Sequence, residues 1–326
     1  MEFDLIELFR SRCAGSRADV RTGIGDDAAV LAVPAGHELV VAVDTLVAGV
    51  HFPGATSARD LGWKALAVNL SDLAAMGATP AWALLALTLP EPDRGFAAAL
   101  AEGFHELAAQ HGVALVGGDT TRGPLSLTVT VHGFVPSQRA LLRSGAAAGD
   151  LVFVTGTLGD AAAGLRCLDP RDPQAHALFH APGDTREHLL ARLNRPTPRI
   201  AAGHALRGVA TACIDVSDGL LADLGHVARA SGVGIEVELE ALPASSALLA
   251  LFDADAREAL QAAGGDDYEL AFTAPPARER DLLRDLARSG CGATRIGRVV
   301  AGEGVRLLDA ARVPVSLRRR GWDHFA

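Results

Sequence analysis

Hydrophobic residues recur along the chain with two spacings, one typical of helices and the other of strands. Within residues 61–77, Leu66, Leu70 and Leu73 return every three or four positions and predict one buried helix face. Helices are predicted over residues 3–12, 61–77, 95–111 and 217–231. Short apolar runs bounded by turn residues predict strands over residues 39–43, 82–89, 113–116, 125–135, 151–154, 210–214, 234–239, 268–273 and 294–300.

The helices and strands alternate in both halves of the chain, which predicts an α/β or α+β fold. A segment rich in Arg, Ser, Ala and Gly, residues 136–149, separates the two halves. We therefore predict two domains, residues 1–140 and 141–326, and 326 residues suffice for both. An alanine-rich helix is expected after Asp160, and residues 170–200, with their Pro and charge, are expected to be irregular.

Composition narrows the class of partners. Hydrophobic residues make up 49% of the chain and charged residues 21%, which supports packed cores over disorder. The net charge is −9 and the sequence has no basic stripe, which argues against a nucleic-acid partner. An acidic protein that binds polyphosphates needs divalent cations to bridge carboxylates and phosphate oxygens.

Cysteine usage and hydropathy indicate a cytoplasmic protein. The four cysteines, at positions 13, 167, 213 and 291, form no CxxC pair, which argues against zinc or redox motifs and suits a reducing compartment. The first residues lack the order of a signal peptide. The longest strongly apolar stretch, residues 81–89, is too short to span a bilayer.

The candidate metal-binding residues are aspartates that follow apolar runs and stand beside glycine or another small residue. They are Asp26, Asp27, Asp44, Asp72, Asp119, Asp215, Asp218, Asp266 and Asp267. Scattered carboxylates suit Mg²⁺, which prefers oxygen ligands and keeps several waters, whereas any single Asp-Gly pair can be an ordinary turn. No GxxxxGK[ST] phosphate loop occurs. Residues 156–160 (GTLGD) read either as a phosphate loop or as a turn between strand and helix, and Ser217 as a helix cap.

Nine segments together resemble the thiamine-monophosphate kinase family of the aminoimidazole ribotide synthetase-like superfamily. The match runs in order over almost the whole chain, in Gly23–Asp27 (GIGDD), Asp44–Val47 (DTLV), His51–Phe52, Lys64–Pro80 (KALAVNLSDLAAMGATP), Gly117–Pro124 (GGDTTRGP), Arg143–Gly145 (RSG), Asp215–Gly219 (DVSDG), Gly265–Leu270 (GDDYEL) and Gly321–Phe325 (GWDHF). The sibling families, the ribotide and selenophosphate synthetases and a hydrogenase-maturation protein, share mainly the glycine-aspartate pattern.

The resemblance implies a two-domain fold, with a mixed sheet in the N-terminal domain that pairs in a homodimer and an α/β C-terminal domain. It implies a site in a cleft between the domains, where ATP phosphorylates thiamine monophosphate to thiamine diphosphate by direct in-line transfer with several Mg²⁺ ions. The metal ligands implied are Asp27, the Val43 carbonyl, Asp44, Asp72, Asp119, Asp215 and Asp218. Gly118, Asp119, Arg143 and Ser217 would bind ATP, and His51, Asp266 and Trp322 would bind thiamine monophosphate.

The reaction itself needs no catalytic base or nucleophile, because the acceptor phosphate is already ionised at neutral pH. The task is to bring two anions together, which many aspartates and their cations would serve. Trp322 would cover the flat, partly cationic thiamine. Each of these residues could instead have a purely structural role: Trp322 as a core or interface aromatic, His51 as a loop histidine bonded to backbone, and Arg143 as a charge in the linker.

The chain departs from the family pattern at two places. Ala42 and Val43 stand where hydroxyl residues are common, which removes a side-chain ligand, and Asp266 stands in place of Glu. Two other functions remain open: another ATP-using enzyme of the superfamily, such as a synthetase acting on a ribotide or a selenium donor, and a non-catalytic protein that binds nucleotide or thiamine phosphate.

Overall fold

The computed structural model describes residues 2–13, 17–172, 180–181 and 183–322, which form two compact units. The N-terminal unit comprises Met1–Leu73 and Ala78–Ala140, and the C-terminal unit comprises Ala74–Gly77 and Leu141–Ala326. The mixed α/β class expected from the sequence is confirmed. Residues 323–325 of the tail motif GWDHF lie outside the described residues.

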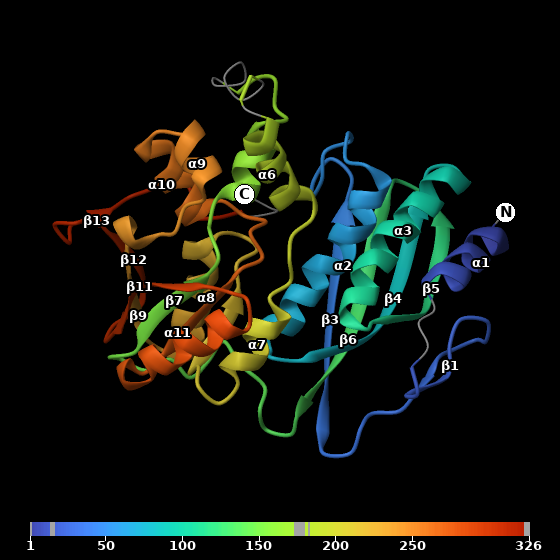
Figure 1. Cartoon of the computed structure of the whole chain (residues 1–326), viewed down its shortest axis with the longest axis horizontal. Coiled ribbons are helices and arrows are strands. Elements are labelled where there is room, and N and C mark those ends of the chain that lie inside the picture. The colour runs from blue at the N-terminus through green and yellow to red at the C-terminus, as the bar shows by residue number, and fades with distance from the viewer. Residues whose placement is uncertain (1, 14–16, 173–179, 182, 323–326) are drawn as a thin grey trace. The chain divides into compact units, whose positions relative to one another are not determined.

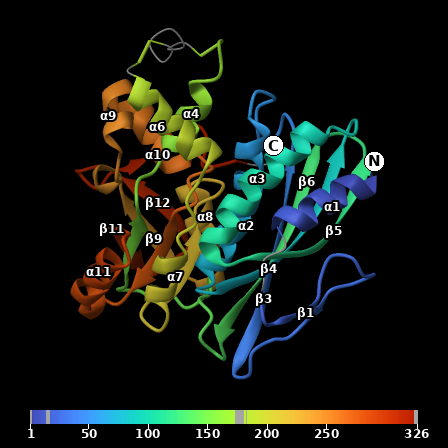
Figure 2. The same ribbon diagram turned by 45° about the vertical axis from the view of Figure 1, so that its right-hand side comes forward.

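The N-terminal unit has a four-stranded sheet with the order β3-β6-β4-β5, in which β4 and β5 are parallel and the other pairs antiparallel. Helices α2 and α3 lie against one face of this sheet (Figures 1 and 2). The elements of this unit are α1 (Glu2–Cys13), β1 (Val20–Thr22), β2 (Val30–Leu31), β3 (His37–Val47), α2 (Ala58–Ala75), β4 (Thr79–Leu89), α3 (Arg94–His111), β5 (Ala114–Arg122) and β6 (Ser126–Pro136).

Two glycines let α2 and α3 approach to backbone contact. A Cβ atom at Gly62 of α2 would overlap the Leu100 carbonyl, and one at Gly103 of α3 would overlap the Arg59 carbonyl. The close approach buries every residue of α2 from Leu61 to Ser71, including the polar Asn69. Such a tightly packed helix is a rigid support for the side chains at its ends.

The C-terminal unit has a mixed seven-stranded sheet with the order β13-β12-β9-β11-β7-β10-β8. Val152 and Val154 of β7 share a core with Leu220 and Leu224 of α8, whereas Phe153 between them stacks on Phe272 at 5.3 Å. This alternation is the period of a strand buried on both faces. The strands of this seven-stranded sheet are β7 (Leu151–Thr155), β8 (Ala212–Asp215), β9 (Gly234–Glu238), β10 (Leu270–Ala274), β11 (Ala293–Val300), β12 (Gly304–Leu308) and β13 (Pro314–Val315).

The helices of this unit include several that the sequence pattern did not predict. The helices of the C-terminal unit in the described residues, predicted or not, are α4 (Asp160–Arg166), α6 (Gly183–Asn194), α7 (Ile200–Leu206), α8 (Leu220–Ser231), η1 (Leu239–Ala241), α9 (Ser246–Leu251), α10 (Ala254–Ala263), η2 (Pro276–Arg278) and α11 (Glu279–Arg288). The irregular segment expected over residues 170–200 is wrong for α6, which buries Leu189 and Leu193, one helical turn apart. Residues 173–179 and 182 lie outside the described residues.

No helix in the described part of the chain is long and apolar enough to cross a membrane.

Candidate functional site

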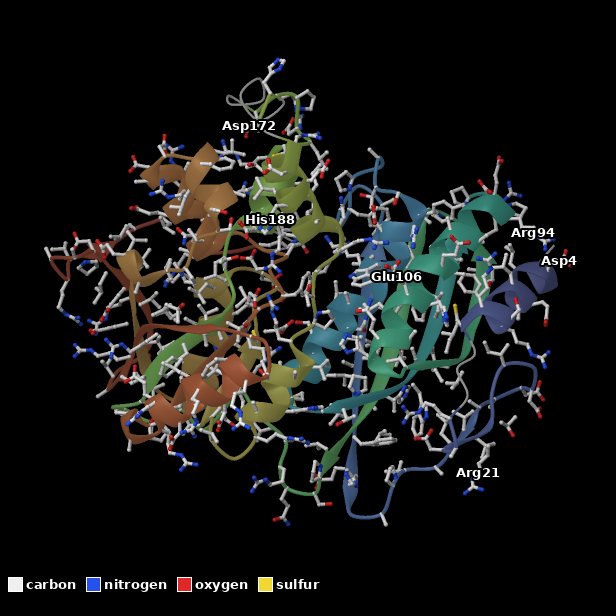
Figure 3. All side chains as sticks on the ribbon, in the orientation of Figure 1. Asp4, Arg21, Arg94, Glu106, Asp172 and His188 are labelled. Carbon is white, nitrogen blue, oxygen red and sulfur yellow. The ribbon has the colours of Figure 1, made fainter. Side chains whose placement is uncertain are left out.

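An acidic pocket of about 1250 Å³ opens in the N-terminal unit, beside β5 and the first helix. Its lining residues include five acids, Asp4, Glu7, Asp26, Asp27 and Asp119, and a single arginine, Arg10. Asp4, on α1, is labelled in Figure 3. The excess of carboxylates would repel a polyphosphate unless cations entered with it.

The loop that carries Asp27 is shaped by glycine. Gly25 adopts φ +121°, a conformation that side chains disfavour, and the Arg10 guanidinium lies next to it. The carboxylate of Asp26 accepts a hydrogen bond from the Asp27 backbone N–H at 2.9 Å, so Asp26 braces the turn. Asp27 is exposed in the pocket, as a cation ligand must be before the cation binds.

Asp119 lies in a strand and not in the loop expected after residue 116. Strand β5 continues to Arg122, and Asp119 pairs in register with Ala86 of β4, both lining the pocket. A Cβ at Gly118 would overlap the Leu85 carbonyl of β4, so glycine is required at this position by strand packing alone. Strand packing therefore explains the glycine at position 118 without any contact to ATP.

Asp44 is held by a buried amide. The backbone N–H of Asp44 on β3 donates to the side-chain oxygen of Asn69 on α2 at 3.0 Å, and the Asn69 amide nitrogen donates to Ala65 O at 2.9 Å. Asp72 follows Asn69 by three residues on the same helix, which is the spacing of one helix face. Asn69 thus ties the strand of one predicted metal ligand to the helix of another.

His51 closes the turn after β3. Its Nδ1 accepts a hydrogen bond from the Val47 backbone N–H at 3.0 Å, and its own backbone N–H donates to Val47 O at 3.0 Å. The neutral ring therefore carries its proton on Nε2. This is the backbone-bonded loop histidine that the sequence left open.

The predicted ligands of this unit do not all meet. Asp44 is on β3 and Asp119 on β5, the two edge strands of the sheet, which are about 14 Å apart at the usual strand spacing. Among the residues the structure describes, no group of three or more His, Cys, Asp or Glu has the geometry to hold a metal ion. Asp27 and Asp119 share the pocket, while the backbone of Asp44 is bonded to Asn69, which precedes Asp72 by three residues on α2.

The C-terminal unit gathers a second acidic group at the start of α8. Asp215 ends β8, and the turn Ser217–Gly219 leads into the helix. The carboxylate of Asp223, in the first turn of α8, accepts hydrogen bonds from the backbone N–H groups of Ser217, Asp218 and Gly219 at 3.1, 3.2 and 3.1 Å. The helix begins after Gly219 with no side-chain cap, so the interpretation of Ser217 as the helix cap is wrong.

The electrostatics of this group show how closely its acids are packed. Burial, together with the nearby carboxylates of Asp215 and Asp218, raises the pKa of Asp223 to about 8, against the lowering effect of the N–H donors. Asp215 is itself only 5% exposed. Carboxyl groups packed so closely repel one another when they are charged, and a cation would relieve that repulsion.

Asp266 is joined to the same turn. Its backbone N–H donates to Ser217 O at 2.8 Å, and its carboxylate accepts a hydrogen bond from the Tyr268 hydroxyl at 2.9 Å. Asp266 and Tyr268 both have positive φ angles, +67° and +51°. Left-handed backbone at an aromatic residue costs energy and is concentrated at functional sites. The strained backbone therefore indicates that the position of Asp266 is functionally important.

Asp267 and Glu269, the other acids of the same motif, face inward. Asp267 accepts a hydrogen bond from the Gly159 N–H at 2.7 Å, and Glu269 accepts from Arg192 at 2.9 Å and Arg199 at 2.6 Å. The N–H groups of Gly156 and Leu158 donate to Gly292 O and Pro243 O. Because these donors are used within the protein, residues 156–160 form an ordinary turn between strand and helix.

Trp322 and Arg143 lie at the surface of the C-terminal unit. Trp322 is 50% exposed, which excludes the core-aromatic interpretation, and its backbone N–H donates to Asp218 O at 2.8 Å. Arg143 is exposed, and the carbonyl of the preceding Leu142 accepts a hydrogen bond from the Cys213 N–H at 2.8 Å, which places this segment beside β8. The structure thus unites Asp215, Ser217, Asp218, Asp266 and Trp322 around one turn.

Sequence reasoning missed two residues that organise these sites. Asn69 is a polar residue in an otherwise apolar helix stretch and is fully buried, a placement that usually means a structural hydrogen bond. Asp223 is an acid in the first turn of a helix, where the N-terminal N–H groups attract carboxylates. Both signals were present in the sequence.

Comparisons with known proteins agree along the whole chain. Residues 25–135 match the family model of the AIR synthase related protein N-terminal domain, and residues 147–310 match that of the C-terminal domain. The thiamine-monophosphate kinase of Salmonella typhimurium is 47% identical over 327 aligned positions, which cover 100% of this chain and 98% of that protein. The Escherichia coli K12 enzyme of the same name is 46% identical, with the same coverage.

Two solved structures are similar over nearly the full length. The crystal structure of thiamine-monophosphate kinase from Stenotrophomonas maltophilia K279a has a TM-score of 0.85 and 49% identity, and the match covers 93% of this chain and 94% of that one. A structure described as AaThiL complexed with AMPPCP and TMP has a TM-score of 0.77 and 34% identity, covering 99% and 97%.

Proposed function

The chain belongs to the thiamine-monophosphate kinases of the AIR synthase related family, and from this we propose that it transfers the γ-phosphoryl group of ATP to thiamine monophosphate. The products are thiamine diphosphate and ADP. The family expected from the motifs is confirmed. The observation that carries the proposal is the 47% identity over the entire chain to an enzyme of that name.

The described residues suit a transfer that uses no protein nucleophile. A phosphate oxygen of thiamine monophosphate attacks the γ-phosphorus, the bond from that phosphorus to the bridging oxygen breaks, and ADP leaves with the electron pair. Burial raises the pKa of Cys13 to about 12 and raises those of Cys167 and Cys291 as well, so these thiols are not poised as thiolates. We therefore propose direct in-line transfer.

The donor set fits magnesium. Its members are carboxylates and a backbone carbonyl, the hard oxygen ligands that Mg²⁺ prefers. We propose that Asp27, Asp119, Asp44, Asp72, Asp215 and Asp218, with the Val43 carbonyl, hold several ions. When bound, these cations would neutralise the negative charge that separates the two phosphates.

The remaining predicted contacts are also proposals. Gly118, Asp119, Arg143 and Ser217 would contact ATP. His51, Asp266 and Trp322 would contact thiamine monophosphate, with the tryptophan ring against the thiazolium cation. Asp266 is a methylene shorter than Glu, and the Tyr268 hydroxyl that bonds its carboxylate would fix its direction.

We propose further that the N-terminal units pair in a cytoplasmic homodimer. Leu39, Val41 and Val43 of edge strand β3 are 43%, 53% and 58% exposed, and alternation puts all three on one face. An exposed apolar face on an edge strand is typical of a surface that binds a second chain.

The test is an assay of ADP release with thiamine monophosphate, with and without a chelator, beside a panel of other phosphorylated acceptors. The proposed function requires turnover that depends on both magnesium and thiamine monophosphate, with thiamine diphosphate identified by mass. Turnover on a ribotide or a selenium donor instead would assign the chain to another enzyme of the superfamily. Ligand binding without any transfer would make it a binding protein, and Asp72→Asn would then leave its cellular role intact.

A further inference from the structure

The chain leading to Trp322 passes so close to α8 that position 321 admits only glycine. A Cβ atom at Gly321 would lie 2.5 Å from the Ala222 Cβ and 2.8 Å from Asp218 O. Both distances are shorter than real Cβ contacts, and one of the two neighbours is backbone that cannot rotate away. Any side chain here would therefore push the tail off the helix.

The same segment is attached at two further points. On one side of Gly321, the Arg320 guanidinium donates to the Val305 carbonyl of β12. On the other side, the Trp322 backbone N–H donates to Asp218 O at 2.8 Å. The backbone of Trp322 is thus fixed while its side chain remains half exposed, the arrangement expected of a ring that receives a ligand.

The turn at Ser217–Gly219 is the common anchor of these attachments. The Asp223 carboxylate holds its N–H groups, the Asp266 N–H holds Ser217 O, and the Trp322 N–H holds Asp218 O. Two residues proposed to bind thiamine monophosphate are therefore hydrogen-bonded through their backbones to a turn proposed to bind ATP and a cation.

We propose that Gly321 is a positioning residue for the kinase reaction: by letting Trp322 bond to Asp218, it sets the position of the substrate-binding ring relative to the cation-binding turn. The inference rests on the proposed function, because it takes Trp322 as a contact of the thiamine moiety. It adds that the contact depends on a close approach of backbone to backbone, and that Gly321 and Arg320 act through Trp322 without touching substrate themselves.

The test is Gly321→Ala, assayed by steady-state kinetics with each substrate varied in turn. The added methyl displaces the Trp322 ring, so KM for thiamine monophosphate should rise about tenfold or more, while KM for ATP changes much less. The melting temperature should stay close to that of the wild type. The matched control is Gly225→Ala, one turn along α8, where a Cβ would meet nothing within 4 Å and the kinetics should not change.

Two further variants separate positioning from general damage. Adding Ala222→Gly to Gly321→Ala removes one of the two overlaps and should recover part of the lost affinity. In a Trp322→Ala background, Gly321→Ala should add little, because both changes act on one ring. Full additivity there, or an unchanged KM in folded Gly321→Ala protein, would overturn the inference.

Should Gly321→Ala fail to fold, Arg320→Gln tests the same point, because it frees the tail from β12 without crowding α8. It should also raise KM for thiamine monophosphate, and an unchanged KM would count against the proposal. Failure of the proposed function can be told apart from failure of this inference, because the wild-type protein itself would then show no turnover with thiamine monophosphate in the same assay.

Discussion

The side-chain oxygen of Asn69 accepts a hydrogen bond from the backbone N–H of Asp44, and this joins the centre of a buried helix to an edge strand. Asn69→Ala would leave that N–H without its acceptor and open a small cavity. We expect a loss of about 1–3 kcal/mol in the free energy of unfolding. We also expect the magnesium concentration for half-maximal activity to rise, because the backbone of Asp44 loses its bond to the helix that carries Asp72.

Val68→Ala is the matched control for this prediction. Val68 is 3% exposed on the same helix, so its truncation should cost comparable stability. Its magnesium requirement should equal that of the wild type. A shift of the same size in both variants would mean that Asn69 serves the fold alone.

Asp44→Asn and Asp119→Asn should each lower turnover at least about a hundredfold at saturating substrates, an effect typical of lost electrostatic stabilisation. Asp119 is exposed and Asp44 half-buried, so the melting temperature should move by only a few degrees. Glu91→Gln, an exposed neutralisation outside the site, is the control and should change neither quantity. A lower melting temperature with unchanged specific activity of the folded fraction would refute the assignment.

Asp223→Ala should be much more damaging than Asp223→Asn. The asparagine oxygen can still accept the N–H groups of residues 217–219, whereas alanine leaves all three without their acceptor, at a cost of roughly 2 kcal/mol or more. Urea unfolding measures the stability and the standard assay measures turnover. Equal effects of the two substitutions would show that the charge, and not the hydrogen bonding, of Asp223 is what matters.

Asp267 should make stability depend on pH. Burial raises the pKa of its carboxyl to about 8, against the opposing effects of Arg192 and the Gly159 N–H. The unfolded residue has a pKa of about 4, so the folded state holds a proton that the unfolded state releases between these values. The stabilisation by this proton is complete below about pH 4 and is lost as the pH rises through about 8.

Asp267→Asn should therefore flatten the decline of stability with rising pH, by up to about 1.4 kcal/mol per pH unit between roughly pH 5 and pH 8. Urea unfolding at several pH values, for both proteins, measures the difference. Asp285→Asn, on the exposed surface of α11, is the control and should leave the curve parallel to that of the wild type. Parallel curves for Asp267→Asn would place the folded pKa of this group near its ordinary value.

Gly62→Ala and Gly103→Ala should each destabilise the N-terminal unit by about 2 kcal/mol or more, because the new methyl overlaps a backbone carbonyl of the facing helix. Thermal unfolding monitored by circular dichroism measures the effect. Gly54→Ala, where a Cβ meets nothing within 4 Å, should have little effect. Three equal melting temperatures would mean that the helices move apart at no cost.

Local patterns in the sequence predicted most elements and the family, but not how strands order themselves. The stripe of Leu66, Leu70 and Leu73 predicted α2 to within a few residues, since its period depends only on near neighbours. That β3 and β5 occupy opposite edges is a property of the whole sheet, and no local pattern reports it. For that reason the sequence could not predict which aspartates of the N-terminal unit lie on the same edge of its sheet.

Smaller errors have local causes. Strand β5 runs on through Gly117 and Gly118, although glycines usually end a strand, and at Gly118 a Cβ would overlap the Leu85 carbonyl of β4. The role of Asp223 was missed because the helix was predicted to begin at residue 217, which put Asp223 beyond its first turn, whereas α8 begins at Leu220. The resemblance, which compares whole motifs, was not affected by such errors.

The bonds of Asp223 also bear on how phosphate is recognised. A tight turn at the start of a helix normally offers its amide hydrogens to a phosphate, but here an internal carboxylate has already taken three of them. A nucleotide arriving at this turn finds the N–H groups of residues 217–219 already bonded, so we expect cations from solution to meet much of its charge. Inhibitors designed to mimic a bare phosphate should consequently gain little at this turn, whereas mimics that carry their own metal should gain more.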